Sequence, residues 1–374
     1  MELFVEGTAL SMRRFLKDGN RGHVGLMNPW TGRYAWSDKF DVERSDAKYL
    51  LGRLWILYLQ TRRAEFREWA MTLLEKIVPA VTDAPHTSRG SACATYYGIC
   101  LGADITGSDE LRKAALRSAD LLIEGLWNSQ ADVFYSKPNG LSTNIDSLAT
   151  LLLLPWCARY DPKYMDYYTR HADSIIRVGI IRPDGSTFQR ADFDEKHRLK
   201  AVTTNQGWKP TSTWARGQSW AMHNFICAYE ATGRASYLDV SVRAANWWVE
   251  HVPQDFVPYY DFDDPQRFEK PRDSCAATIA VLALIRLAKA RPDLAATYEP
   301  VITSTLNELY KNYITDGGLV VHGSWGDARW QVGRPRPLRF PQEDVMPFGQ
   351  YYLAEALYRR LTDDWSLLRL APKA

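Results

Sequence analysis

Residues 94–126 read ATYYGICLGADITGSDELRKAALRSADLLIEGL, and this stretch decides the fold class. Its first part, residues 94–103, is apolar on nearly every side, which predicts a buried helix. A turn follows at TGSD, residues 106–109, and residues 110–126 then carry apolar side chains at three- and four-residue spacing. That spacing is typical of a helix with one exposed face. The stretch therefore predicts a hairpin made of a buried helix and a half-exposed helix.

The same pattern recurs along the chain. Predicted hairpins pair residues 50–60 with 65–77, 145–158 with 163–178, 218–230 with 237–251, and 276–288 with 296–314, and residues 348–361 begin a last hairpin closed by the short tail. A lone hairpin cannot cover a helix that is apolar all round, whereas stacked neighbours can. We therefore expect an all-α (α/α)6 toroid, a single domain over residues 1–374 with residues 1–35 as an N-terminal lead-in. The alternative is an open solenoid, which would need polar terminal caps.

Composition limits the classes of function. The 46 Lys and Arg residues are matched by 44 Asp and Glu residues, and no basic run stands apart, so we expect no nucleic-acid partner. The longest apolar run, around residues 148–156, is too short to span a membrane, and the first twenty residues lack the apolar core of a signal peptide. The five cysteines form no CxxC pair, which predicts reduced, buried thiols. We expect a soluble, cytoplasmic protein.

Six short segments in the long predicted loops carry a resemblance to a known family. They are STWARGQSWA at 212–221, VPYYDFD at 257–263 followed by PRDSCAA at 271–277, IDSL at 145–148, and DGSTF at 184–188 with TNQG at 204–207. Together they make the chain similar to the unsaturated glucuronyl hydrolases, over roughly residues 36–361. The WARGQxWA and RDSxAA segments are specific in combination, whereas either alone would be a weak signal.

This resemblance implies an (α/α)6 barrel that acts on oligosaccharides released by polysaccharide lyases. The terminal uronic acid of such a substrate carries a C4=C5 double bond, which the family hydrates, and the resulting hemiketal opens so that the glycosidic bond falls apart. The resemblance implies no metal and no organic cofactor. The sequence agrees, since it offers no HExxH motif and no cluster of His with carboxylates at ligand spacing.

The resemblance makes Asp146 the catalytic residue. Protonation of an enol-ether carbon needs a positioned acid, addition of water needs a base, and one carboxyl group can serve as both in turn. Partial burial near the ring axis would favour the protonated form. The alternative is that Asp146 caps the helix that follows it, because Asp is a preferred N-cap residue.

The remaining candidates are substrate-binding residues. Arg216 and Arg272 could clamp a substrate carboxylate, or could form structural ion pairs with Asp273 or Asp261. Trp214 and Trp220 could stack on sugar rings or fill the core. The resemblance adds Gln206 as a ligand of a substrate hydroxyl, and places Gln189 and Ser88 in the same site.

Three departures from the family pattern lie at this site. The family has a second aspartate in an HD-x-G-like segment, and here PHTSRGS at 85–91 puts Thr87 or Ser88 at that position. Gln189 and Asn205 stand where the family has histidines. These changes leave open a diverged enzyme that uses Asp146 to isomerise, hydrate or cyclise another alkene, and a non-catalytic sugar-binding relative.

Overall fold

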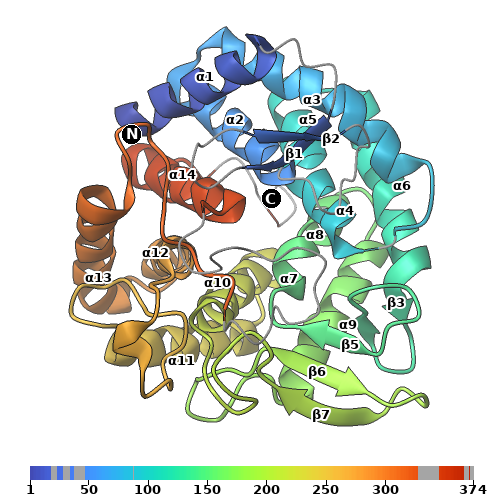
Figure 1. The fold of residues 1–374 in the computed structure, drawn as a ribbon. Coiled ribbons are helices and arrows are strands. Elements are labelled where there is room, and N and C mark those ends of the chain that lie inside the picture. The colour runs from blue at the N-terminus through green and yellow to red at the C-terminus, as the bar shows by residue number, and fades with distance from the viewer. Residues whose placement is uncertain are drawn as a thin grey trace.

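The computed structural model describes residues 1–17, 23–27, 34–37, 47–86, 88–326, 345–365 and 370. Two concentric rings of helices surround a common axis (Figure 1). The inner helices are α2 (Ala47–Thr61), α4 (Arg89–Ala94) running through a π-helical segment (Thr95–Cys100) into α5 (Leu101–Thr106), α7 (Ser147–Thr150) with α8 (Leu153–Cys157), α10 (Ala215–Thr232), α12 (Ser274–Ala290) and α14 (Pro347–Thr362). The outer helices are α1 (Glu2–Lys17), α3 (Ala64–Thr82), α6 (Asp109–Leu126), α9 (Lys163–Arg177), α11 (Ala235–His251) and α13 (Ala295–Glu308), which continues as a π-helical turn (Leu309–Tyr313).

The inner ring is closed. Each inner helix packs against the next one along the chain, and α14 packs against α2 to complete the circle. An open solenoid would leave these two helices apart, so the solenoid alternative is wrong and the predicted (α/α)6 toroid is confirmed. None of the helices in the described ranges is long and apolar enough to cross a membrane.

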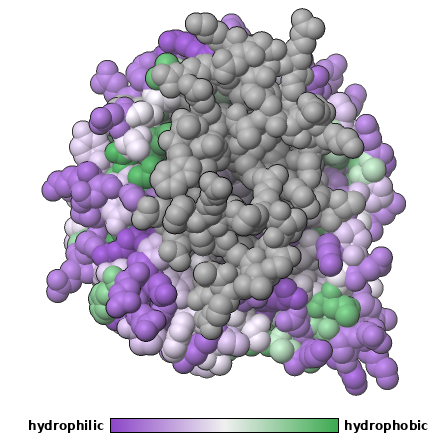
Figure 2. All heavy atoms as spheres, viewed as in Figure 1, coloured by the Kyte–Doolittle hydropathy of each residue, from purple (hydrophilic) through white to green (hydrophobic). Residues whose placement is uncertain are grey.

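Burial follows the predicted division between inner and outer helices. Every residue of α12 from Ser274 to Leu287 is buried, as expected for a helix covered on all sides. In α6 the six apolar residues at helical spacing are all buried: Leu111, Ala114, Ala115, Ala119, Leu122 and Leu126. Figure 2 shows mostly hydrophilic side chains around the margin of the viewed face, where Figure 1 places the outer helices.

Close approach between inner helices depends on glycine. A Cβ atom on Gly98 would lie 2.4 Å from Leu51 Cδ2, so a larger residue here would force the Leu51 side chain to move. The Trp55 Nε1–H group of α2 donates to the Gly98 carbonyl over 3.0 Å. Gly98 lies in the π-helical segment, and its carbonyl also accepts from the Leu101 N–H.

Residues 145–158 were expected to form one helix, but they form the two short helices α7 and α8. The reason is Pro155. Proline has no backbone N–H, and its ring clashes with the carbonyl of the residue four positions earlier, here Leu151. The chain therefore leaves the helical path at Leu151 and resumes it at Leu153.

Residues 1–35 were predicted as an N-terminal lead-in, and most of their first half forms a helix. Residues 2–17 form α1, which lies on the outer side of the ring beside α2 and α14 (Figure 1) and buries Phe4, Val5, Ala9 and Met12 in the common core. The Arg53 guanidinium of α2 lies over the Phe4 ring, 5.6 Å from its centre. Helix α1 therefore takes the outer position that we had given to the C-terminal tail, most of which lies outside the described residues.

A small sheet joins two segments that were predicted as long loops: the one before α7 and the one between α9 and α10. Its strands β5 (Ser142–Asn144), β6 (Arg190–Phe193) and β7 (Leu199–Thr203) pair antiparallel in the order β5-β6-β7. Two further antiparallel pairs are β1 (His23–Met27) with β2 (Tyr34–Ser37) and β3 (Trp127–Asn128) with β4 (Val133–Phe134). The sheet fixes the end of β5, from which the chain enters α7.

A buried network of charges links three inner helices. Arg286 of α12 pairs with Glu355 of α14 at 2.5 Å and with Glu230 of α10, and Arg359 pairs with Glu355 at 2.8 Å. Burial alone would raise the pKa of Glu355, but Arg359 and Arg286 outweigh it and lower the pKa to about 2. The carboxylate is therefore ionised in the folded protein.

We expect Glu355→Gln to lower the free energy of unfolding by about 3–5 kcal/mol, because it leaves two buried guanidinium groups short of their shared counter-charge. Urea-induced unfolding followed by circular dichroism measures the change. The matched control is Glu299→Gln, which removes an exposed partner of Arg360 and should cost about 0–1 kcal/mol. Equal losses in the two variants would contradict the central role of the network.

Candidate active site

The backbone around Asp146 is held from two sides. The Ile145 N–H donates to the Gln189 carbonyl over 2.8 Å, which extends the β5–β6 pairing by one residue. The Ile145 carbonyl accepts from Asn224 Nδ2 of α10 over 2.7 Å. The residue before Asp146 is thus tied both to the sheet and to an inner helix.

The residue after Asp146 is tied to the outer ring. The Ser147 hydroxyl lies 2.7 Å from His171 Nε2 of α9, and the Phe134 N–H donates to His171 Nδ1 over 3.2 Å. Because Nδ1 accepts, the ring proton is on Nε2, which donates to Ser147. This buried Ser–His pair therefore does not activate a nucleophile, and instead fixes the start of α7. Burial first, and Arg89 second, lower the pKa of His171 to about 3.

The Asp146 side chain has no structural task that the described residues reveal. It makes no capping hydrogen bond to α7, which removes the support for the helix-cap alternative. Its Oδ1 atom is buried and without a hydrogen-bond partner in the described part of the chain. The side chain as a whole is 39% exposed. One face of the carboxyl group is thus turned inward and the other is accessible.

Arg89 is the charged neighbour of Asp146. Its Nη2 atom lies 3.9 Å from Asp146 Oδ1 and donates to the Ser136 hydroxyl over 3.3 Å. The Ser88 hydroxyl accepts from the Gly90 N–H over 3.0 Å and so caps α4. Of the two positions at which the second carboxylate was expected, Ser88 therefore serves as a helix cap, and Thr87 lies outside the described residues.

Gln189 and Gln206 belong to a chain of amide hydrogen bonds. Gln189 Nε2 donates to Gln206 Oε1 over 2.6 Å, and Gln189 Oε1 accepts from the backbone N–H groups of Gln206 and Asn205. Gln206 Nε2 donates in turn to the Trp325 carbonyl over 2.7 Å. The pair joins the sheet that positions Asp146 to the loop that follows α13.

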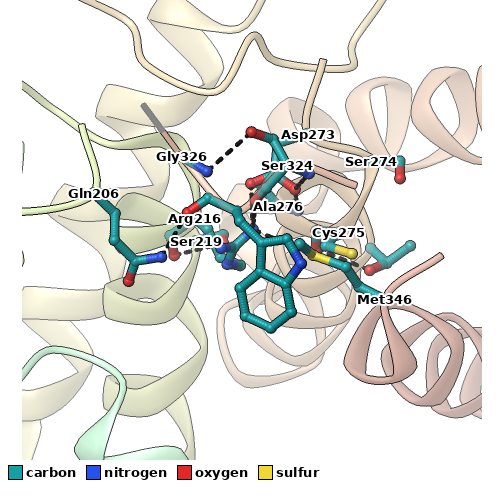
Figure 3. A network of polar contacts seen from close by, with 12 residues as sticks. Gln206, Arg216, Ser219, Asp273, Ser274, Cys275, Ala276, Ser324, Gly326 and Met346 are labelled. Atoms are coloured by element: carbon teal, nitrogen blue, oxygen red, sulfur yellow. Dashed lines mark hydrogen bonds and ion pairs between the residues drawn. The ribbon is translucent and has the colours of Figure 1, made fainter. Parts of the chain in front are cut away.

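Arg216 is locked at the first turn of α10 (Figure 3). Its Nη1 atom lies 2.7 Å from Asp273 Oδ2 and also donates to the Ser324 carbonyl. The guanidinium lies between the rings of Trp214 and Phe348, at 4.5 Å and 5.1 Å from their centres, and the side chain is only 3% exposed. The structural ion pair with Asp273 that the sequence offered as an alternative is therefore formed.

Trp214 lies beside the segment that carries Asp146. A Cβ atom on Gly217 would meet Trp214 Cε3 at 3.0 Å and Ile145 Cγ2 at 3.8 Å, so the indole and Ile145 converge on the same glycine. The Trp214 Nε1 atom is buried and has no hydrogen-bond partner within the described ranges. The indole is only 3% exposed, so its contact with a sugar stays a prediction.

Arg272 and Trp220 are placed differently. Arg272 pairs with Asp255 at 2.9 Å, not with Asp273 or Asp261, and its guanidinium lies 3.8 Å from the centre of the Tyr259 ring. Trp220 packs in the core against Tyr352, with ring centres 5.2 Å apart. The substrate-binding roles of these two residues stay predictions, and their contacts agree with the structural alternatives.

Tyr49 is a neighbour of Asp146 that the sequence did not reveal. It lies in the first turn of α2, half-buried, with its ring 5.8 Å from that of Phe348. The pKa of Tyr49 is raised, mainly because the phenol is buried and in smaller part because Cys93, Tyr352 and Asp146 lie near it. No motif marks it, but an aromatic residue opening an inner helix, as Trp214 does before α10, was the available signal. No group of His, Cys, Asp or Glu among the described residues is arranged to hold a metal ion.

Comparisons with known proteins agree with this arrangement. The chain is 28% identical over 373 residues to the unsaturated glucuronyl hydrolase of Bacillus sp. strain GL1, covering 95% of this chain and 94% of that protein. It is 28% identical over 335 residues to the unsaturated chondroitin disaccharide hydrolase of Streptococcus pneumoniae, covering 84% and 81%. The crystal structure of the Bacillus sp. GL1 unsaturated glucuronyl hydrolase superimposes with a TM-score of 0.83 at 25% identity, covering 96% of each chain. No family model matches the sequence.

The chain belongs to the unsaturated glucuronyl hydrolase family. As a member of this family it brings Ser88, Asp146, Gln189, Gln206, Trp214 and Arg216 to one rim of the toroid, through the contacts given above. Its departures cluster there as well. Gln189, one of the two residues that stand where the resemblance expects imidazoles, is hydrogen-bonded to Gln206, and a guanidinium lies beside Asp146.

The buried His171 of this family member predicts a pH dependence of stability. A histidine with a pKa of about 3 in the folded state and about 6.5 in the unfolded chain is protonated first in the unfolded chain as the pH falls. Its contribution to stability is therefore complete above pH 6.5 and is lost progressively below it. We expect the difference in unfolding free energy between the wild type and His171→Gln to shrink between pH 7 and pH 5, by up to about 1.4 kcal/mol per pH unit.

Urea titrations at pH 8, 7, 6 and 5 measure this difference. Glutamine can keep both contacts, because its oxygen can accept from Phe134 and its amide can donate to Ser147. The difference should not change between pH 8 and pH 7. A difference that also stays constant down to pH 5 would show that His171 is not held neutral.

Proposed function

We propose that this protein hydrates the C4=C5 double bond of a terminal unsaturated uronic acid in an oligosaccharide. Asp146 donates a proton to C4, and the cation that develops at C5 takes up water, whose proton returns to Asp146. The product at C5 is a hemiketal, which opens and releases the adjoining sugar. The bonds formed are C4–H and C5–O, and the carboxyl group ends as it began.

One observation carries this proposal: the state of the Asp146 side chain. The backbone on both sides of Asp146 is fixed, yet its carboxyl group makes no cap and is partly accessible. A carboxyl group held in place without a structural task suits an acid that must reach a carbon atom of a ligand. The similarity to hydrolases named for unsaturated uronyl substrates, over more than four fifths of the chain, supports this reaction over another alkene reaction.

The substrate class follows from the named relatives. One relative is named for an unsaturated glucuronyl substrate and another for an unsaturated chondroitin disaccharide. We therefore propose an unsaturated uronyl disaccharide or short oligosaccharide as the partner of the site, with Trp214 lining it. A cytoplasmic location is part of the proposal, and it is supported by five buried cysteines that are all free thiols.

Asp146→Asn should lower turnover of an unsaturated chondroitin disaccharide by about 10²–10⁴-fold, because an amide cannot deliver a proton to carbon. The decrease in ultraviolet absorbance of the conjugated double bond measures the rate. Circular dichroism should match the wild type, since the carboxylate makes no hydrogen bond to α7, whereas the unfolding midpoint should fall because the buried Arg89 loses its nearest counter-charge. Full activity in this variant would refute the mechanism.

Ser88→Asp tests whether a second carboxylate is missing. Asp is as good an N-cap as Ser, so α4 should be kept, and the new carboxylate would favour the protonated form of Asp146. We expect turnover at neutral pH to rise, by up to about tenfold. Ser108→Asp is the matched control, because Ser108 caps α6 in the same way. Thr87→Asp tests the other register, and no gain in either variant would mean that the second carboxylate is not needed.

A further inference from the structure

Asp261 is a buried carboxyl group that neither the proposed reaction nor an ion pair uses. It lies between α11 and α12 and is 0% exposed, and none of the ion pairs within the described ranges includes it. The sequence left it open as a partner of two arginines. Arg216 pairs with Asp273 instead. Arg272 pairs with Asp255. Burial of a carboxylate without an ionic partner is costly unless hydrogen bonds compensate for the lost water.

Three groups donate hydrogen bonds to this carboxyl group, and two of them belong to one loop. Asp261 Oδ2 accepts from the Trp208 N–H over 2.9 Å and from the Ser212 hydroxyl over 2.7 Å. Its Oδ1 atom accepts from the Asp263 N–H over 2.9 Å. A proton on either oxygen would displace one of these donors, so the full set of hydrogen bonds needs the ionised carboxylate.

The contact between Asp261 and the loop of residues 204–212 is close. A Cβ atom on Gly207 would lie 2.3 Å from Asp261 Oδ2 and 2.7 Å from Ser212 Oγ. The two ends of the loop are joined by the Thr204 hydroxyl, which donates to the Ser212 carbonyl over 2.6 Å. The carboxylate therefore lies directly against the backbone of the loop, beside the point at which its ends meet.

Both sides of this contact lead to the candidate site. Gln206 lies in the loop, next to the glycine that touches Asp261. Trp214 and Asp261 form a backbone bridge immediately before α10. Asp261 thus connects the segment that carries Gln206 to the segment that carries Trp214.

Burial sets the charge state of Asp261. Burial raises the pKa of this carboxyl group to about 6, the three hydrogen bonds oppose the rise, and the charge of Asp263 adds to it. Arg182 lies within electrostatic range of Asp261, and it acts in the same way on two other carboxylates, those of Asp184 and Asp263. The Lys209 ammonium faces the ring of the tryptophan before it, 4.5 Å from the ring centre. Asp261 is therefore mainly ionised at pH 7 and mainly protonated at pH 5.

We propose that Asp261 is a positioning residue for the substrate site: its carboxylate holds the loop of residues 204–212 against the entry to α10, and the site binds substrate less tightly when this carboxyl group is protonated. This inference rests on the proposed function. Asp261 takes up a proton more readily in the folded chain than in the unfolded chain, so its protonation stabilises the folded state. Substrate affinity should therefore fall between pH 7 and pH 5 while the fold is kept.

The test measures kcat and KM of the wild type and Asp261→Asn on an unsaturated chondroitin disaccharide between pH 5 and pH 8. In the wild type, KM should rise by about tenfold from pH 7 to pH 5, as expected when one group with a pKa of about 6 must be ionised. Asparagine has one acceptor oxygen for donors on two sides. We therefore expect the KM of Asp261→Asn to be about tenfold higher at pH 7 and to stay constant as the pH falls.

Two further variants separate positioning from a general effect on structure. Ser212→Ala keeps the carboxylate but removes a hydrogen bond that lowers its pKa, so the rise in KM should begin at a higher pH than in the wild type. The matched control is Asp264→Asn, because Asp264 is a buried aspartate of the same segment whose carboxylate accepts from Tyr260 and Gln266. Its KM should follow the wild-type profile. A rise in KM below pH 7 that persists in Asp261→Asn would overturn the proposal, and so would a lower kcat at unchanged KM.

A second readout does not depend on the substrate. The Trp208 N–H donates directly to Asp261, so its ¹⁵N–¹H resonance should follow the ionisation of the carboxyl group. With ¹⁵N-labelled tryptophan, this resonance can be assigned by its absence in Trp208→Phe. It should shift with a midpoint near pH 6 in the wild type but not in Asp261→Asn. If the disaccharide is not turned over but the resonance titrates in this way, the proposed function fails and the hold of Asp261 on the loop stands. If turnover occurs and KM stays constant from pH 8 to pH 5, only the role of Asp261 fails.

Discussion

The structure depends on one constraint: helices that are apolar on every side must be covered on every side. Helix α12 shows it most clearly, because α10, α14 and α13 all pack against it and its residues from Ser274 to Leu287 are buried. A row of hairpins satisfies this requirement everywhere except at its two ends. Contact between α14 and α2 removes the ends. The charged network around Arg286 can be buried only because this closure excludes water from both sides.

The closed ring also explains how residues far apart in sequence form one site. The first turns of α4 and α10 and the entry to α7 lie on the same rim, so the chain segments that open these inner helices meet there (Figure 1). The three-stranded sheet and the amide chain from Gln189 to Trp325 then link the connecting segments to one another. The toroid supplies the rim, and these short links fix the position of Asp146 on it.

Much of the fold and of the candidate site could be predicted from the sequence, and each prediction that failed did so for a physical reason. Helical periodicity located nearly all the hairpins because burial repeats with the helix period. It could not show the break at Leu151, since a proline in the first turn of a helix and a proline inside a longer one look alike. The partners of Arg216 and Arg272 depended on how two loops pack, which periodicity does not encode. Helix α1 was missed because no second helix follows it after a short turn: α1 ends at Lys17, and α2 begins only at Ala47.

Helix α1 has a consequence for how the protein is made. One of its sides meets α2 and the start of α3, through Phe4 with Arg53 and through Arg13 with Glu65, and these segments are synthesised soon after it. Its Gly7 lies against the Gly317 carbonyl, which is synthesised 310 residues later. At about 5–20 residues per second, that stretch takes roughly 15–60 s to synthesise. Throughout this interval α1 can pack against α2 and α3 but lacks its neighbour at Gly317, so its place in the toroid is completed only when the segment after α13 has left the ribosome.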